Sequence, residues 1–86
     1  MYDYQFTDIA LKQLSKLPKE TAQRILDKLD YYCSSKHPLR YADFLTDSRL
    51  GSFRFRIGDY RVVFDIEDES IVVLAVGHRK SIYKKR

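Results

Sequence analysis

The chain has 86 residues, of which 44% are hydrophobic and 14% aromatic, and its formal net charge is +4. A chain this short holds one hydrophobic core, so we expect residues 1–86 to form a single domain. The composition excludes a disordered chain, and no apolar run reaches the roughly 18 residues of a membrane span.

The first 17 residues predict a strand and a short helix. The segment MYDYQF alternates aromatic with polar residues, which is the period of a half-buried strand. Thr7 or Asp8 can then cap a helix that ends before Pro18. The apolar positions of this helix recur at helical spacing and are Ala10, Leu11, Leu14 and Leu17.

A second helix is predicted from Pro18, which suits a first helical turn, to about Ser35. Its apolar stripe consists of Ala22, Ile25, Leu26, Leu29 and Cys33. Two helices joined at a proline are expected to form a hairpin that packs on one face of a sheet. Cys33, the only cysteine, excludes an internal disulfide and a multi-cysteine metal site, and a reducing cytoplasm is the expected location.

Residues 35–51, SKHPLRYADFLTDSRLG, show neither period and are predicted to form a loop. His37 in this loop has no neighbours with metal-ligand spacing, so it is not predicted to be functional. We predict no metal and no other cofactor.

Three strands follow, at residues 52–57, 60–66 and 71–76, with turns at Gly58-Asp59 and Asp68-Glu69. The last strand, IVVLAV, is apolar throughout, as expected for a strand that is buried on both faces in the middle of a sheet. The predicted order is β-α-α-β-β-β, an α+β fold with the helix hairpin on one face of a mostly antiparallel twisted sheet.

The hairpin closed by Gly58-Asp59 separates two faces. A two-residue turn pairs Arg56 with Arg61 and Arg54 with Val63. All three arginines then lie on the face of the hairpin opposite to the aromatic and aliphatic residues. Like charges on opposite strand positions repel and lower the stability of the fold, so something other than stability must favour the arrangement. Asp65 is the candidate acid for partial neutralisation, and an ordinary solvated face is the alternative interpretation.

Several guanidinium groups on one face suit phosphate, because each presents a fixed fork of donors and stays charged. They also stabilise the negative charge that a phosphodiester gains during cleavage. Binding and catalysis are therefore expected to use the same side chains.

The C-terminal segment adds further basic and aromatic residues. Residues 70–86 carry no acidic side chain and five basic ones, which are Arg79, Lys80, Lys84, Lys85 and Arg86. This asymmetry indicates a polyanionic partner, either nucleic acid or an acidic protein, although a basic tail that only aids solubility is the alternative. Strict alternation from the Asp68-Glu69 turn places Arg79 on the apolar face of the sheet, whereas Arg61 lies on the other face. A break in the alternation is therefore expected at Gly77.

The segments FRFRIGDYRVVF and VGHRKSIYKKR, with the order of elements, closely resemble the RelE branch of the RelE/ParE toxin superfamily over essentially the whole chain. The resemblance implies a toxin of a type II toxin–antitoxin pair, held inactive by an antitoxin that wraps it. RelE-like members cut messenger RNA in the ribosomal A site, by attack of the ribose 2′-OH on the adjacent phosphate.

The resemblance also implies roles for individual residues. Arg61 and Arg79 match the phosphate-stabilising arginines of the family, and Tyr83 matches the tyrosine that orients or stacks on the target nucleotide. Arg54 and Arg56 fall where family members often carry lysines. Four side chains are thus expected to bind RNA phosphate: Arg54, Arg56, Lys80 and Lys84.

The arginines at positions 54 and 56 are a departure from the family, because an arginine is an implausible general base. Histidine is the residue type best suited to proton transfer near neutrality, so His78 is the predicted proton-transfer group. Two alternatives stay open: a ParE-like inhibitor of DNA gyrase, which shares the fold, and a module that binds RNA or the antitoxin without catalysis.

Overall fold

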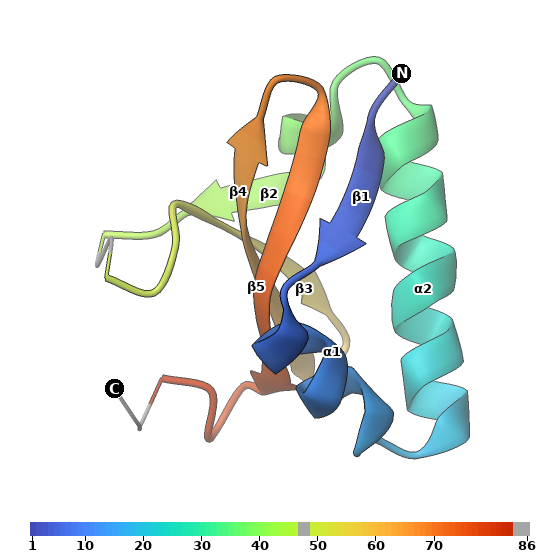
Figure 1. Ribbon diagram of the computed structural model, residues 1–86, viewed down its shortest axis with the longest axis vertical. Coiled ribbons are helices and arrows are strands. Elements are labelled where there is room, and N and C mark those ends of the chain that lie inside the picture. The colour runs from blue at the N-terminus through green and yellow to red at the C-terminus, as the bar shows by residue number, and fades with distance from the viewer. Residues whose placement is uncertain (47–48, 84–86) are drawn as a thin grey trace.

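Two helices and a five-stranded mixed sheet make up the fold in the computed structural model, which describes residues 1–46 and 49–83 (Figure 1). The strand order is β1-β5-β4-β3-β2, with β1 parallel to β5 and every other pair antiparallel. The predicted α+β fold is confirmed, and one further strand, β2, was not predicted. No helix of the described residues is long and apolar enough to cross a membrane.

Helix α1 (Asp8–Ser15) follows strand β1 (Asp3–Phe6), and its first turn is capped by Thr7, whose side-chain oxygen accepts a hydrogen bond from the N–H of Ala10 at 3.2 Å. Ala10 and Leu14 are buried, whereas Leu11 is 53% exposed. The prediction that Leu11 shares the apolar stripe is wrong, because so short a helix packs on the sheet along a single line of side chains.

Helix α2 (Lys19–Ser34) begins after Pro18 and ends as predicted. Its buried residues are Ile25, Leu29, Tyr32 and Cys33. They pack with α1 on the apolar face of the sheet, and both helices lie on the same side (Figure 1).

The segment predicted to be a loop instead contains a 3-10 helix, η1 (Pro38–Tyr41), and the edge strand β2 (Ala42–Phe44). Ala42 pairs with Phe55, and Asp43 pairs with Arg54. The loop prediction is wrong here because three residues are too few to display an alternating pattern.

The central hairpin of β3 (Phe53–Ile57) and β4 (Tyr60–Glu67) has the predicted register, with Arg56 opposite Arg61 and Ile57 opposite Tyr60. Gly58 adopts φ 61°, a left-handed conformation that glycine adopts without steric cost. A left-handed glycine at the first position of a two-residue turn matches the strand twist, so it fixes the register.

Strand β5 (Ser70–His78) contains a bulge that the sequence did not locate. Phe64 pairs with Val73 but Val63 pairs with Ala75, so Leu74 has no partner on β4. The bulge lies at Leu74 and not at Gly77, which corrects the expected break. It shifts the rest of β5 by one residue, so that Gly77 pairs with Arg61 and His78 with Tyr60.

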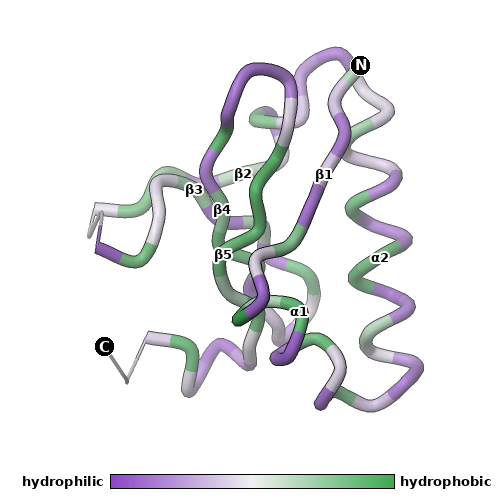
Figure 2. Tube along the Cα trace, viewed as in Figure 1, coloured by the Kyte–Doolittle hydropathy of each residue, from purple (hydrophilic) through white to green (hydrophobic). Residues whose placement is uncertain are grey.

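Strand β5 lies between β1 and β4 and is apolar over most of its length (Figure 2). On its helix side Ile71, Val73 and Val76 are buried in the core. On the other side Ala75 and its partner Val63 are buried too. Val63 and Leu74 lie under the chain at Gly51. The prediction of a strand covered on both faces is confirmed in this region.

Candidate nucleic-acid interface

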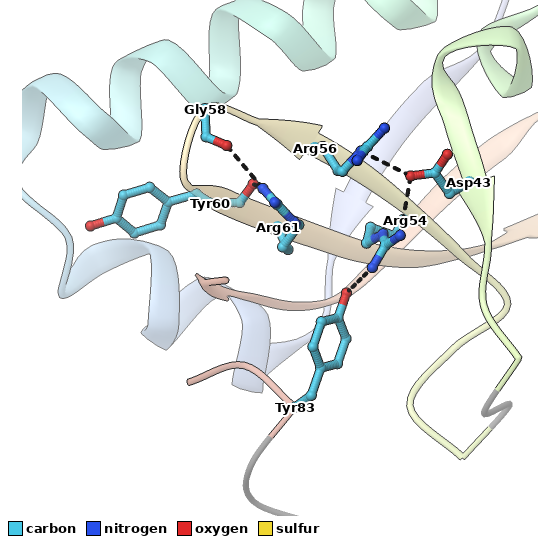
Figure 3. Close-up of polar contacts among 7 residues, drawn as sticks. All are labelled: Asp43, Arg54, Arg56, Gly58, Tyr60, Arg61 and Tyr83. Carbon is cyan, nitrogen blue, oxygen red and sulfur yellow. Dashed lines mark hydrogen bonds and ion pairs between the residues drawn. The ribbon is translucent and has the colours of Figure 1, made fainter. Parts of the chain in front are cut away.

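Three arginines project from the sheet face opposite the helices, and we call Arg54, Arg56 and Arg61 the arginine face (Figure 3). Their strand neighbours Phe55, Ile57 and Val62 are buried in the core. Because side chains alternate along a strand, burial of these neighbours directs the arginines to the other side. The arrangement is therefore a consequence of the aromatic and aliphatic pattern.

Asp43 of β2 neutralises part of the arginine face (Figure 3). One carboxylate oxygen, Oδ2, lies 3.2 Å from Nη2 of Arg54 and 3.1 Å from Nε of Arg56. This acid was not expected from the sequence, because it belongs to the segment predicted to be a loop. The expected acid, Asp65, instead accepts a hydrogen bond from the backbone N–H of Ser52 at 2.8 Å.

The repulsion between Arg56 and Arg61 is reduced by the directions of their side chains (Figure 3). Arg56 extends toward Asp43, whereas Arg61 extends toward the β3–β4 turn. Nη1 of Arg61 donates hydrogen bonds to the carbonyl oxygens of Gly58 at 2.9 Å and Tyr60 at 3.0 Å. Burial and the positive charge of Arg54 lower the pKa of Arg61.

Tyr83 reaches the arginine face from the C-terminal segment. The carbonyl of His78 accepts hydrogen bonds from the N–H groups of Ser81 and Ile82, at 3.0 and 2.9 Å, which closes one helical turn after β5. This turn brings Ile82 over Gly77, where a Cβ atom would lie 3.3 Å from the Cβ of Ile82. The absence of a side chain at Gly77 thus lets the segment fold close to the sheet.

The hydroxyl of Tyr83 accepts a hydrogen bond from Nη1 of Arg54 at 3.1 Å (Figure 3). The guanidinium carbon of Arg54 lies 6.0 Å from the centre of the Tyr83 ring. The bond to Tyr83 and the ion pair with Asp43 outweigh burial and raise the pKa of Arg54. Arg54 is therefore a fixed cation at the centre of the group.

Arg79 lies beside the turn end of the arginine face. Its backbone N–H donates to the carbonyl of Asp59 at 2.7 Å, and its Nε lies 3.3 Å from Oδ1 of the same residue. The charge of Arg79 is close enough to Arg61 to lower the pKa of Arg61 further. Lys80 is exposed, and the predicted phosphate ligand Lys84 lies outside the described residues.

His78 lies on the other side of the sheet. It pairs with Tyr60, whose side chain packs against the core, and the two rings are 5.4 Å apart in an edge-to-face arrangement. Nδ1 of His78 accepts a hydrogen bond from the backbone N–H of Lys80 at 3.1 Å. The structure brings Arg54, Arg61 and Tyr83 together but does not bring the His78 ring into this group.

The chemistry available on this surface is anion binding. Guanidinium groups and a phenol can surround a phosphodiester and stabilise added negative charge. Within residues 1–46 and 49–83, no three His, Cys, Asp or Glu side chains gather into a metal site. The side chains of the arginine face thus supply fixed positive charge and hydrogen-bond donors.

The chain is similar in sequence to toxins of type II toxin–antitoxin systems. Residues 4–83 match the profile of a family described as the ParE toxin of the type II toxin–antitoxin system parDE. The chain is 34% identical over 86 residues to Toxin RelG of Mycobacterium tuberculosis, and the match covers 98% of each chain.

Two solved structures resemble this fold closely. A RelBE toxin–antitoxin complex from Mycobacterium tuberculosis has a TM-score of 0.76 and 32% identity, covering 91% of this chain and 98% of that chain. The archaeal RelE–RelB complex from Pyrococcus horikoshii has a TM-score of 0.71 and 26% identity, covering 93% and 97%. Both similarities span nearly the whole chain.

Proposed function

The chain belongs to the ParE toxin family of type II toxin–antitoxin systems, within the RelE/ParE superfamily, and we propose that it cleaves messenger RNA in the ribosomal A site. Family membership agrees with the resemblance seen in the sequence. The observation that carries the proposal is the gathering of Arg54, Arg61 and Tyr83 on one sheet face, with Arg79 beside it. The similar RelE–RelB structures support the RelE branch.

In the proposed reaction the 2′-oxygen of one nucleotide attacks the adjacent phosphorus. The 2′-hydroxyl loses its proton, the bond to the 5′-oxygen breaks, and that oxygen gains a proton. The products are a cyclic phosphate and a free 5′-hydroxyl. Negative charge increases on the phosphate oxygens, so Arg61 and Arg79 are proposed to stabilise it by donating N–H groups. Arg54, Arg56, Lys80 and Lys84 are proposed to bind neighbouring phosphates.

Tyr83 is proposed to orient the target nucleotide. Its hydroxyl is already directed to Arg54, so a base that stacks on the ring lies next to a fixed cation. Stacking holds the ribose and phosphate in a constant position relative to the arginines. Correct positioning of this kind is a large part of the rate enhancement of phosphoryl chemistry.

Proton transfer is assigned to His78 in this proposal. Its ring now contacts Tyr60 on the helix side of the sheet. Direct action at a phosphate held by Arg61 therefore needs the His78 ring to leave Tyr60 and turn toward the arginine face when RNA binds, while Arg79 and Tyr83 keep their positions. That movement breaks the edge-to-face contact with Tyr60 and the hydrogen bond that Nδ1 of His78 accepts from the N–H of Lys80.

The partners proposed for this chain follow from the same similarities. The structures that resemble it are complexes of a toxin with its antitoxin, so we expect a cognate antitoxin to bind this chain. Acidic residues of that antitoxin are expected to meet the arginine face and the C-terminal cations. The ribosome and messenger RNA are the proposed targets when the antitoxin is absent.

Two other functions remain as alternatives. The matching family profile is that of ParE toxins, which favours inhibition of DNA gyrase. A module that binds RNA without cutting it is the second alternative, because Asp43 and the turn carbonyls already occupy several guanidinium donors.

The deciding experiment adds purified toxin to programmed ribosomes and maps the 5′ ends of the message. We expect cuts in the A site, and we expect Arg61→Ala to lower the single-turnover rate about 100-fold or more. Lys28→Ala, an exposed change on α2, is the matched control and should cleave at the rate of the unmodified chain. DNA breaks that depend on gyrase would support the ParE function instead. If neither RNA cuts nor DNA breaks are found, binding without catalysis is the function that remains.

A further inference from the structure

A second basic surface lies where the chain leaves α2 and enters η1. A hollow of about 240 Å³ is lined there by Ser35, Lys36, His37, Arg40 and Tyr41. None of these five residues is acidic, and Lys36 and Arg40 each carry a positive charge. The hollow is smaller than the roughly 300 to 1,000 Å³ of sites that enclose a small molecule. Its size and charge suit the phosphate of a larger polyanion.

An aromatic pair borders this hollow. The rings of Tyr31 and Tyr41 are 5.8 Å apart, and 59% and 40% of the two residues, respectively, is exposed. Tyr41 also stacks on Tyr32 at 4.7 Å, and Tyr32 is buried against Phe55 at 4.5 Å. The exposed rings are thus held by a buried aromatic partner, which limits the entropy lost when a ligand stacks on them.

The backbone around the hollow is also fixed. Pro38 is fully buried, and the carbonyl of His37 accepts a hydrogen bond from the N–H of Arg40 at 3.0 Å. The N–H and hydroxyl of Ser35 both donate to the carbonyl of Tyr32, at 3.2 and 2.9 Å. The backbone that carries Lys36, Arg40 and Tyr41 is therefore held in place without a bound partner.

Cations alone attract any polyanion, but exposed aromatic rings beside them favour nucleic acid over an acidic peptide. Single-stranded RNA presents unstacked bases that pack on tyrosine, while its phosphates bind lysine and arginine. We define the second basic surface as Tyr31, Lys36, His37, Arg40 and Tyr41. We propose that it binds single-stranded RNA, with a phosphate at Lys36 and Arg40 and a base on the exposed tyrosines.

This site is separate from the arginine face. Tyr41 packs against α2 on the helix side of the sheet, whereas Asp43, two residues later, contacts Arg54 and Arg56 on the opposite side. The proposal rests on the proposed function, in which the target is a ribosome. There the arginine face holds the message, and the second basic surface holds an unpaired strand of ribosomal RNA.

The test measures binding of a fluorescent single-stranded RNA with 2′-O-methyl riboses, which cannot be cleaved by 2′-OH attack. The double variant Lys36→Ala, Arg40→Ala is compared with Lys12→Ala, Lys16→Ala, which removes two exposed charges from α1 and its C-terminal end. We expect at least tenfold weaker binding for the first pair and less than twofold for the second. The slope of log affinity against log salt should also become shallower, by about 0.7 for each phosphate of the single strand that the variant no longer neutralises.

The tyrosines are tested with Tyr31→Ala and Tyr31→Phe, because Tyr31 is largely exposed and its replacement leaves the core intact. We expect Tyr31→Ala to weaken binding at least fivefold and Tyr31→Phe to bind like the unmodified chain. Equal losses of affinity for the two charge pairs would overturn the proposal. So would unchanged RNA binding combined with weaker binding of an acidic antitoxin peptide.

The two proposals fail in different ways. If the unmodified chain cleaves messages on ribosomes and the double variant Lys36→Ala, Arg40→Ala binds RNA as well as the unmodified chain does, only the proposal for the second basic surface fails. Absence of cleavage together with the expected tenfold loss of affinity would remove the proposed reaction and retain the RNA site.

Discussion

Arg54 of β3 and Asp43 of β2 face each other across the edge of the sheet, and their side chains form an ion pair of 3.2 Å. The same carboxylate oxygen lies 3.1 Å from Arg56, so one acid serves two of the three cations of the arginine face. Asp43 thereby reduces the repulsion that the hairpin register creates. It also sets the directions in which both guanidinium groups point.

Replacing Asp43 by Asn should lower the free energy of unfolding by about 0.5 to 1 kcal/mol at low salt, because the cations lose their shared counter-charge. The destabilisation should shrink in roughly 0.5 M salt, at which screening reduces the remaining repulsion. Urea unfolding at both salt concentrations measures the effect. A destabilisation that is independent of salt would mean that Asp43 acts through packing and not through charge.

The two groups of Tyr83 should have separable effects. Tyr83→Phe keeps the ring and removes the acceptor for Arg54, so we expect cleavage on ribosomes to fall only a few-fold. Tyr83→Ala also removes the stacking surface and should lower the rate at least tenfold. Single-turnover cleavage measures both, with circular dichroism to confirm folding. Equal rates for the two variants would show that the ring has no role in positioning.

His78→Gln tests the assignment of proton transfer. We expect the single-turnover cleavage rate to fall at least tenfold while ribosome binding changes less than twofold, because general acid–base catalysis is worth about 10² to 10⁴. A rate equal to that of the unmodified chain would exclude His78 from the mechanism, in agreement with its position against Tyr60.

Cys33 should make the protein less stable at alkaline pH. The residue is 4% exposed, and burial, followed by the nearby Asp3 and Asp30, raises the pKa of its thiol to about 11. An unfolded thiol ionises at about pH 8.5, so the stabilisation is complete below that pH and is lost as the pH rises toward 11. We expect about 2 kcal/mol less stability at roughly pH 10.5 than at pH 7.5 from this residue.

Cys33→Ala provides the control for this prediction. Burial also raises the pKa of Tyr4, to about 12, but that residue is present in both proteins and cancels in the comparison. The variant should be less stable at about pH 7.5, because it leaves a small cavity, and should lose less stability on going to about pH 10.5. Parallel pH profiles for the two proteins would contradict the assignment to Cys33.

Local sequence signals were sufficient to predict the central hairpin and the face that the arginines occupy. Alternating apolar residues and a left-handed glycine in a two-residue turn leave one register, and Arg56 stands opposite Arg61 in that register. The two helices were equally predictable, because their apolar residues recur at helical spacing and their starts are marked by Thr7 and Pro18. Signals of this kind need no knowledge of distant contacts.

The side chains that complete the site depend instead on tertiary packing. The pairing of Asp43 with Arg54 requires a three-residue edge strand, which has too few residues to show a period. The bulge at Leu74 lies inside an apolar run in which every position looks alike, yet it turns His78 toward Tyr60 and Gly77 toward Ile82. Contacts between residues far apart in sequence form only when the whole fold brings them together, so no local sequence pattern predicts them.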